Sequence, residues 1–83
     1  MTEPGRAFLL LHPDDNVATL IDDRAEQTRL SDGKAIEPGI AFGHKFAICR
    51  IPQGAPVIKY GVQIGLSLAD IEPGQHVHVH NCR

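Results

Sequence analysis

The stretch Ile71-Glu72-Pro73-Gly74-Gln75-His76-Val77-His78-Val79-His80 joins a tight-turn signal to a strictly alternating run. In the first part, the proline ring fixes one backbone φ angle of the turn, and glycine can adopt the positive φ angle that such a turn needs. In the second part, successive side chains of an extended strand point to opposite faces. The three histidines are therefore expected to share one face of a strand, and Val77 and Val79 to lie on the other face and be buried. A tight turn followed by a short strand is the building unit that this stretch predicts.

The same turn signal, an isoleucine followed by a proline and a glycine, occurs twice earlier in the chain, in Ile36-Glu37-Pro38-Gly39 and in Ile51-Pro52-Gln53-Gly54. In each copy the isoleucine is expected to anchor the turn. Apolar and alternating runs then predict short strands over residues 7–11, 17–21, 46–51, 57–60 and 76–79. Residues 67–70 lack β-branched side chains, so a capped helical turn with Ser67 as N-cap is predicted there. The predicted fold class is mainly β, a compact barrel-like or clip-like fold with one short helical turn.

Two polar segments separate the first predicted strands. Pro13 pushes His12 toward extended geometry, and Asp14-Asp15-Asn16 predicts a turn because Asx side chains bond their own backbone. Residues 22–34 are the most polar stretch of the chain. They are predicted to be a surface loop or hairpin with a turn at Asp32-Gly33.

Length and charge limit the classes of function. Eighty-three residues predict one domain over residues 1–83. The net charge of −2 is spread over the chain without a basic cluster, which argues against nucleic acid and anionic membranes as partners. No run approaches the ~20 apolar residues of a transmembrane helix. The start of the chain does not resemble a signal peptide, and two cysteines are few for a secreted scaffold of this size. A cytoplasmic protein with two free thiols is expected, with Cys49 in the core.

Four sequence blocks together resemble a known family, and the resemblance extends over most of the chain from residue 8 to residue 82, with the blocks in the family's order. They are His12-Pro13-Asp14-Asp15-Asn16-Val17-Ala18, Gly43-His44-Lys45-Phe46-Ala47, Val57-Ile58-Lys59-Tyr60-Gly61 with Ile64-Gly65, and Val77-His78-Val79-His80-Asn81. The chain resembles the small N-terminal domain of the altronate/galactarate dehydratases, lyases that remove water from sugar acids. The resemblance implies a SAF module with a β-clip fold, shared with type III antifreeze proteins and sialic acid synthases.

The resemblance also implies a function within a larger enzyme. Such a module is fused to a large catalytic domain or made as a small subunit, and it contributes substrate or metal contacts. The assembled enzyme is expected to use a divalent metal (Fe²⁺, Mn²⁺ or Mg²⁺), while this domain alone is expected to be inactive because it is too small to enclose the acid. Four alternatives stay open: a ligand-binding or assembly module without catalytic residues, the small subunit of a related lyase such as sulfolactate sulfo-lyase, a structural oligomerisation unit, and an autonomous metal carrier. Valine-rich strands that pair across a symmetric interface would also make a homo-oligomer.

The alternating histidines are the candidate metal ligands. Residues i and i+2 of a strand stand about 7 Å apart, and the imidazoles of His78 and His80 can lean together toward one ion. His76 would lie ~13 Å from His80 in an extended strand, too far to join unless the strand bulges. The alternative is a solvent-facing polar edge whose histidines bond carbonyl groups or water.

A second polar group is expected around His12. Its imidazole, held by the carboxylate of Asp15, would act as a base, and the alternative is an Asx turn with no chemistry. Lys45 is a candidate partner for a substrate carboxylate and His44 a donor to a hydroxyl, whereas a lone loop lysine is more often solvated surface. By resemblance, the catalytic candidates are His12 and His78. By the same resemblance, the substrate-binding candidates are Asn16, His44, Lys45, Lys59, Tyr60 and Asn81.

Overall fold

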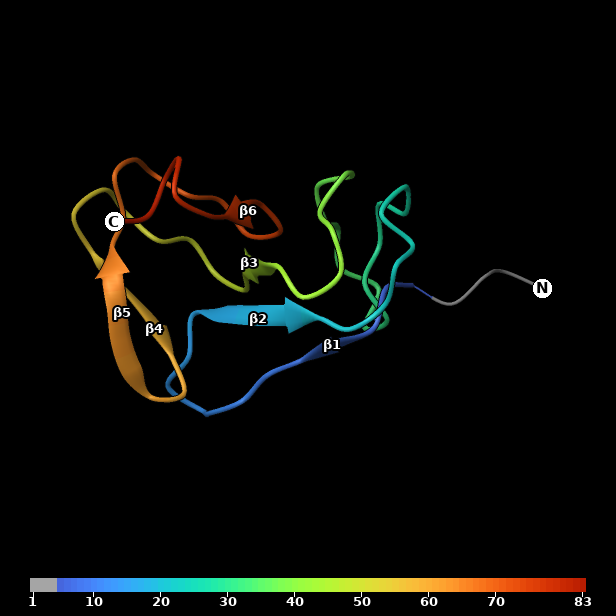
Figure 1. Ribbon diagram of the computed structural model, residues 1–83, viewed down its shortest axis with the longest axis horizontal. Coiled ribbons are helices and arrows are strands. Elements are labelled where there is room, and N and C mark those ends of the chain that lie inside the picture. Colours follow the sequence, from blue (N-terminus) through green and yellow to red (C-terminus); the bar gives the residue numbers. More distant parts are fainter. Residues whose placement is uncertain (1–4) are drawn as a thin grey trace.

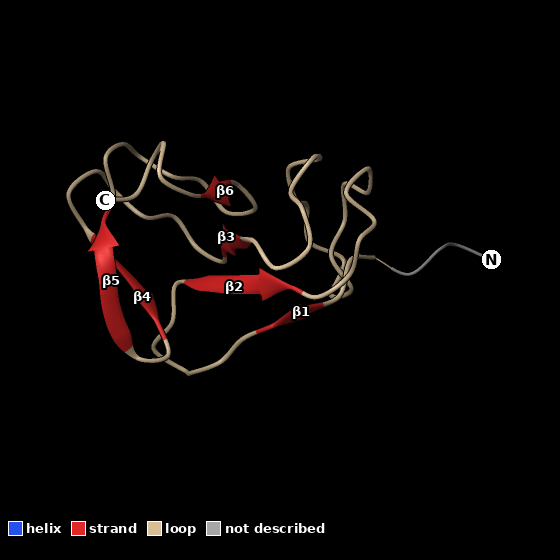
Figure 2. Ribbon diagram, viewed as in Figure 1, coloured by secondary structure: helices blue, strands red, loops and turns tan. Residues whose placement is uncertain are grey.

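The computed structural model describes residues 5–83, and these residues form two antiparallel β-sheets (Figure 1). The larger sheet has the order β1-β2-β3-β6 and the smaller sheet pairs β4 with β5. The strands are β1 (Phe8–Leu9), β2 (Val17–Leu20), β3 (Lys45–Ala47), β4 (Pro56–Lys59), β5 (Val62–Leu66) and β6 (His76–Val77). The mainly β fold class is confirmed, and the described chain is otherwise turns and loops (Figure 2).

The three predicted turns anchored by isoleucine are confirmed. Ile36, Ile51 and Ile71 are 4%, 1% and 1% exposed, and the glycine that closes each turn has a positive φ. The backbones of Ile51 and Ile71 exchange two hydrogen bonds of 2.8 Å, so two of the turns support each other. These turns hold the ends of the short strands together.

The helical turn expected over residues 67–70 is wrong, since the described residues contain no helix. The amide of Ser67 donates to the carbonyl of Ala55, and the amide of Leu68 donates to the carbonyl of Asn81. Ser67 also forms a bridge with Cys82. Pairing with distant segments therefore replaced the local helical bonds that the sequence favoured.

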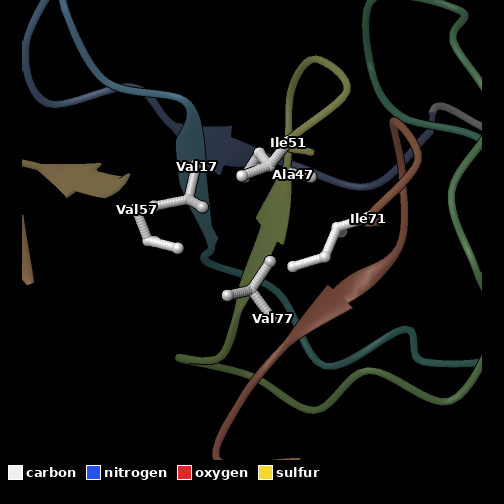
Figure 3. Packing of buried hydrophobic residues seen from close by; sticks show 6 residues of the cluster. All are labelled: Val17, Ala47, Ile51, Val57, Ile71 and Val77. Atoms are coloured by element: carbon white, nitrogen blue, oxygen red, sulfur yellow. The ribbon is translucent and has the colours of Figure 1, made fainter. Parts of the chain in front are cut away.

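The core consists of two hydrophobic clusters, one on each side of the central strands. The first contains Val17, Ala47, Ile51, Val57, Ile71 and Val77 (Figure 3). The second contains Ala18, Leu20, Leu30, Ile36, Ile40 and Phe46. Adjacent residues of β2 (Val17 and Ala18) and of β3 (Phe46 and Ala47) belong to different clusters, because successive strand residues face opposite sides. These two strands are thus buried on both faces.

Several boundaries differ from the sequence predictions. The strands expected over 46–51 and 76–79 end at Ala47 and Val77, and β5 was not predicted. Both cysteines are free, as expected, but Cys49 is exposed, so its assignment to the core is wrong. It follows the end of β3, where the backbone bends and the burial pattern of the strand stops. The turn at Asp32-Gly33 is confirmed by a positive φ at Gly33. None of the described residues belongs to a helix long and apolar enough to cross a membrane.

A buried arginine lies at the start of the described chain. Arg6 is 0% exposed, and its guanidinium donates to the carboxylate of Asp22 at 2.8 Å and to the carbonyl groups of Asp22 and Ile40. The other carboxylate oxygen of Asp22 accepts from the amide of Ala7 at 2.9 Å. Burial alone would raise the pKa of Asp22, but the Ala7 hydrogen bond and the Arg6 ion pair hold this pKa below its usual value. This polar pair ties the chain's start to the loop after β2.

Candidate functional site

Four histidines gather where β3 meets β6, and we call His44, His76, His78 and His80 the histidine cluster. The antiparallel register pairs Phe46 with His76, which places His78 opposite His44. Nδ1 of His44 and Nε2 of His76 lie 3.0 Å apart and share one hydrogen bond. The ring centroids of His44 and His78 are 5.2 Å apart, and those of His76 and His80 are 5.6 Å apart. A non-local strand pairing thus brings His44 to the three alternating histidines.

The cluster forms because the last strand stops early. The amides of Asn81 and Cys82 both donate to the carbonyl of His78, which closes a turn over residues 78–81. The side chain of Asn81 accepts from the amide of His78 at 2.9 Å and donates to the carbonyl of His76 at 2.7 Å. Local Asx bonds of this kind compete with strand pairing. The expected burial of Val79 is therefore wrong, since its exposed fraction is 78%.

The same turn overturns the expected spacing of the histidines. An extended strand would separate His76 and His80 by ~13 Å, whereas the turn brings the two rings into contact. No three described histidine, cysteine, aspartate or glutamate side chains are arranged to hold a metal ion. The assignment of His78 and His80 as metal ligands stays a prediction. An ion held by these two imidazoles would need further donors, from water, substrate or another polypeptide, to complete its shell.

The cluster disfavours a positive charge on its central member. Burial is the largest cause that lowers the pKa of His76, and the neighbouring His44, His78 and His80 add to it. Glu37 acts in the opposite direction, and its carboxylate accepts from the amide of His76 at 2.9 Å. The imidazole of His76 is therefore neutral at pH 7.

Mild acid is expected to destabilise the fold through His76. Because the folded-state pKa lies below the ordinary value of 6.5, the unfolded state binds the proton more readily. The stabilising contribution of neutral His76 is present above pH 6.5 and is lost as the pH falls through the lowered folded-state pKa of this residue. The melting temperature, measured with a chelator present, should fall by a few degrees between pH 7.5 and 5.5. In His76→Gln this fall should be clearly smaller, and an equal fall in both proteins would contradict the prediction.

A groove lies directly beside the histidine cluster. Its volume is about 200 Å³, and it is lined by Lys45, Ile64, His78, Val79, Cys82 and Arg83. Lys45 is in β3 next to His44, while Arg83 pairs through its backbone with Leu66 of β5. Two cationic side chains and an imidazole line one groove, a set of donors that fits a carboxylate. The sequence singled out Lys45 and His78 but not Arg83 and Ile64, because only tertiary contacts place the latter two here.

A second group of candidates lies at the turn between β4 and β5, which we call the hairpin tip (residues 59–62). The carboxylate of Asp15 accepts from the amides of Tyr60 at 3.1 Å and Gly61 at 2.8 Å. The expected pairing of Asp15 with His12 is therefore wrong. The imidazole of His12 instead accepts from the amide of Asp14, whose carboxylate lies 3.9 Å away. A Cβ on Gly61 would lie 2.9 Å from Nε2 of His12, so this ring packs against the tip.

Asn16 connects the two sheets. Its side-chain oxygen accepts from the amide of Ile58 at 2.8 Å, and its side-chain nitrogen donates to the carbonyl of Pro56 at 2.9 Å. These bonds hold β4 beside the start of β2. A substrate contact by Asn16 stays a prediction, and its amide already has this structural role.

The structure divides the candidates into two groups. His44, Lys45, His78, His80 and Asn81 belong to the β3–β6 side of the molecule. His12, Lys59 and Tyr60 lie at the hairpin tip. In Figure 1 the β4–β5 turn is at the lower left and β6 is at the top, so the two groups are separated. They do not form one site within this chain.

These features define a class of protein: a small all-β domain that presents polar side chains at its surface. Residues 6–83 match the family model described as the altronate/galactarate dehydratase SAF domain, and the chain belongs to this family. The membership predicted from the four sequence blocks is confirmed.

Named relatives occur in two arrangements. The chain is 48% identical over 79 residues to altronate dehydratase of Escherichia coli (strain K12), covering 92% of this chain and 16% of the relative. It is 37% identical over 81 residues to altronate dehydratase of Bacillus subtilis (strain 168), covering 94% and 16%. It is 31% identical over 86 residues to (2R)-sulfolactate sulfo-lyase subunit alpha of Chromohalobacter salexigens, covering 92% of each chain. The chain thus spans 16% of the length of the two altronate dehydratases and almost all of the sulfo-lyase subunit.

Proposed function

We propose that this domain is the accessory domain or small subunit of a sugar-acid dehydratase and supplies substrate or metal contacts to a larger catalytic polypeptide. The observation that carries the proposal is the histidine cluster beside a groove lined by Lys45 and Arg83. The similarity to altronate dehydratases supports the sugar-acid substrate. A lyase class for the assembled enzyme, a divalent metal and a cytoplasmic location belong to the same proposal.

The geometry fits the charge changes of a dehydration. Removing a proton next to a carboxylate builds negative charge on that carboxylate, and cationic side chains stabilise this charge. Lys45 and Arg83 would hold the carboxylate, and His78, which lines the same groove, is placed to move a proton. The lowered pKa of His76 disfavours a positive charge on this member of the cluster at neutral pH. A divalent ion, when bound, would neutralise further charge on the carboxylate.

A related lyase is the second candidate. The chain covers 92% of the length of sulfolactate sulfo-lyase subunit alpha, so the small subunit of such a lyase is the alternative function. The identity of 48% to an altronate dehydratase extends over 79 residues, whereas the same identity to another sulfolactate sulfo-lyase subunit alpha extends over 44, which favours the first candidate. A comparison of the rates at which the assembled enzyme turns over a sugar acid and sulfolactate distinguishes the two candidates. In either case, the isolated chain is expected to show no turnover.

The test is His78→Ala in the assembled enzyme. Loss of a general acid or base removes a factor of about 10²–10⁴, so kcat should fall at least about 100-fold while the complex elutes unchanged on size-exclusion chromatography. Gln53→Ala, in an exposed turn outside both candidate groups, is the control and should keep full activity. A His78→Ala complex that assembles poorly but turns over normally per complex would instead favour an assembly module. Normal assembly with normal turnover would reject the role of the cluster.

A further inference from the structure

The hairpin tip presents an aromatic side chain on an unfavourable backbone. Tyr60 has φ 57°, and among residues 5–83 it is the one residue other than glycine with a positive φ. With Gly61 at φ 71°, it forms a two-residue hairpin turn in which both residues are left-handed. Asn-Gly is the sequence that this turn prefers, because asparagine tolerates the conformation and a bulky aromatic residue does not. The turn itself therefore gives no reason for a tyrosine.

The turn is held rigidly by the rest of the domain. The nearly buried carboxylate of Asp15, 5% exposed, binds both amides of the turn, and the ring of His12 packs against Gly61. Strained residues persist where the surrounding structure fixes them, and such residues cluster at functional sites. The domain thus fixes the position of the Tyr60 backbone without using its side chain in the core.

The ring of Tyr60 faces outward. Its exposed fraction is 62%, and that of Val62 on the other side of the turn is 61%. Nζ of Lys59 lies over the ring, 5.3 Å from its centroid. An exposed tyrosine on a backbone that the domain holds in place fits an interface anchor, since tyrosine is enriched among the residues that dominate binding energy.

We propose that the hairpin tip is a docking anchor that inserts Tyr60 into the catalytic polypeptide of the assembled lyase. This inference rests on the proposed function. The chain spans 16% of the length of two altronate dehydratases and nearly the whole of a subunit designated alpha in a sulfo-lyase, so in both kinds of relative further polypeptide accompanies the matching domain.

The experiment uses the single tyrosine of the chain as a probe. Incorporation of 3-fluorotyrosine gives one ¹⁹F resonance, which reports on Tyr60 alone. Titration with the separately expressed catalytic polypeptide should shift or broaden this resonance. Calorimetry should show that Tyr60→Asn raises Kd at least tenfold, while its melting temperature is no lower than that of the parent. If Tyr60 had only a structural role, its replacement by asparagine would not weaken binding while leaving the melting temperature of the domain unchanged.

Phe42→Asn is the matched control, because Phe42 is an exposed aromatic residue of the same exposed fraction, 63%, in a turn away from the hairpin tip. It should change Kd less than twofold. Binding with an unchanged ¹⁹F resonance and an unaffected Tyr60→Asn variant would overturn the docking role and leave the proposed function standing. A resonance that broadens with the concentration of the chain alone would assign the tip to a second copy and overturn the proposal. Absence of any binding would overturn both proposals.

Discussion

Asp22→Asn is expected to leave the domain with little or no net stability. The substitution removes the negative partner of Arg6, whose side chain is completely buried. Breaking a buried ion pair on one side costs about 3–5 kcal/mol, because the remaining charge stays buried without compensation. Whole domains are stable by only about 5–15 kcal/mol, and a chain of this size is expected near the lower limit. Urea denaturation followed by circular dichroism measures the loss.

Asp23→Asn is the matched control for this experiment. It makes the same chemical change one residue further along, at an exposed position, and should cost less than about 0.5 kcal/mol. The free energy of unfolding of the unsubstituted domain should also fall in acid, because the folded-state pKa of Asp22 is below the ordinary value of 3.8. The stabilising contribution of the Asp22 carboxylate is present above pH 3.8 and is lost as the pH falls through the folded-state pKa. Equal stability of the two variants would show that Arg6 is held by its carbonyl partners alone.

The sequence predicted the parts of the fold that depend on neighbours in the chain. The three turns anchored by isoleucine and the Asp32-Gly33 turn follow from dihedral preferences of proline and glycine, which act over a few residues. The helical turn at Ser67 was also a local prediction, and it failed because the amide of Ser67 pairs with Ala55. Local preference decided the structure only where no distant strand supplied a competing hydrogen bond.

The candidate site shows the same division. Residue type and alternation identified the histidines, but an extended strand placed them too far apart. The side chain of Asn81 ends β6 because it forms hydrogen bonds with the backbones of His76 and His78. No sequence pattern predicts these hydrogen bonds, because they form only once the chain turns after His78. The contact of His44 with His76 depends on the pairing of β3 with β6, across thirty-two residues. The Arg6–Asp22 pair is equally non-local and was not predicted.

Gly74→Ala is expected to have the second largest effect, and its cause is a close backbone approach. A Cβ on Gly74 would lie 2.5 Å from the carbonyl oxygen of Ala35. That backbone is fixed, because the amide of Glu37 donates to the carbonyl of Gly74, and the amide of Gly74 donates to Ala47. The positive φ of 87° adds strain for any residue with a Cβ. Left-handed strain of about 1–2 kcal/mol and overpacking of about 1–3 kcal/mol together predict a loss of about 2–5 kcal/mol.

Gly54→Ala separates the two causes. Gly54 closes the equivalent turn with φ 83°, but a Cβ there meets nothing within 4 Å. This variant should show the left-handed strain alone, about 1–2 kcal/mol, so the difference between the two unfolding free energies measures the clash with Ala35. Gly74→Ala should also displace Glu37, whose carboxylate binds the amide of His76, and the His76 imidazole signals in an NMR spectrum should move. Equal losses in the two variants would mean that the segment at Ala35 yields, and the histidine cluster would then not depend on this turn.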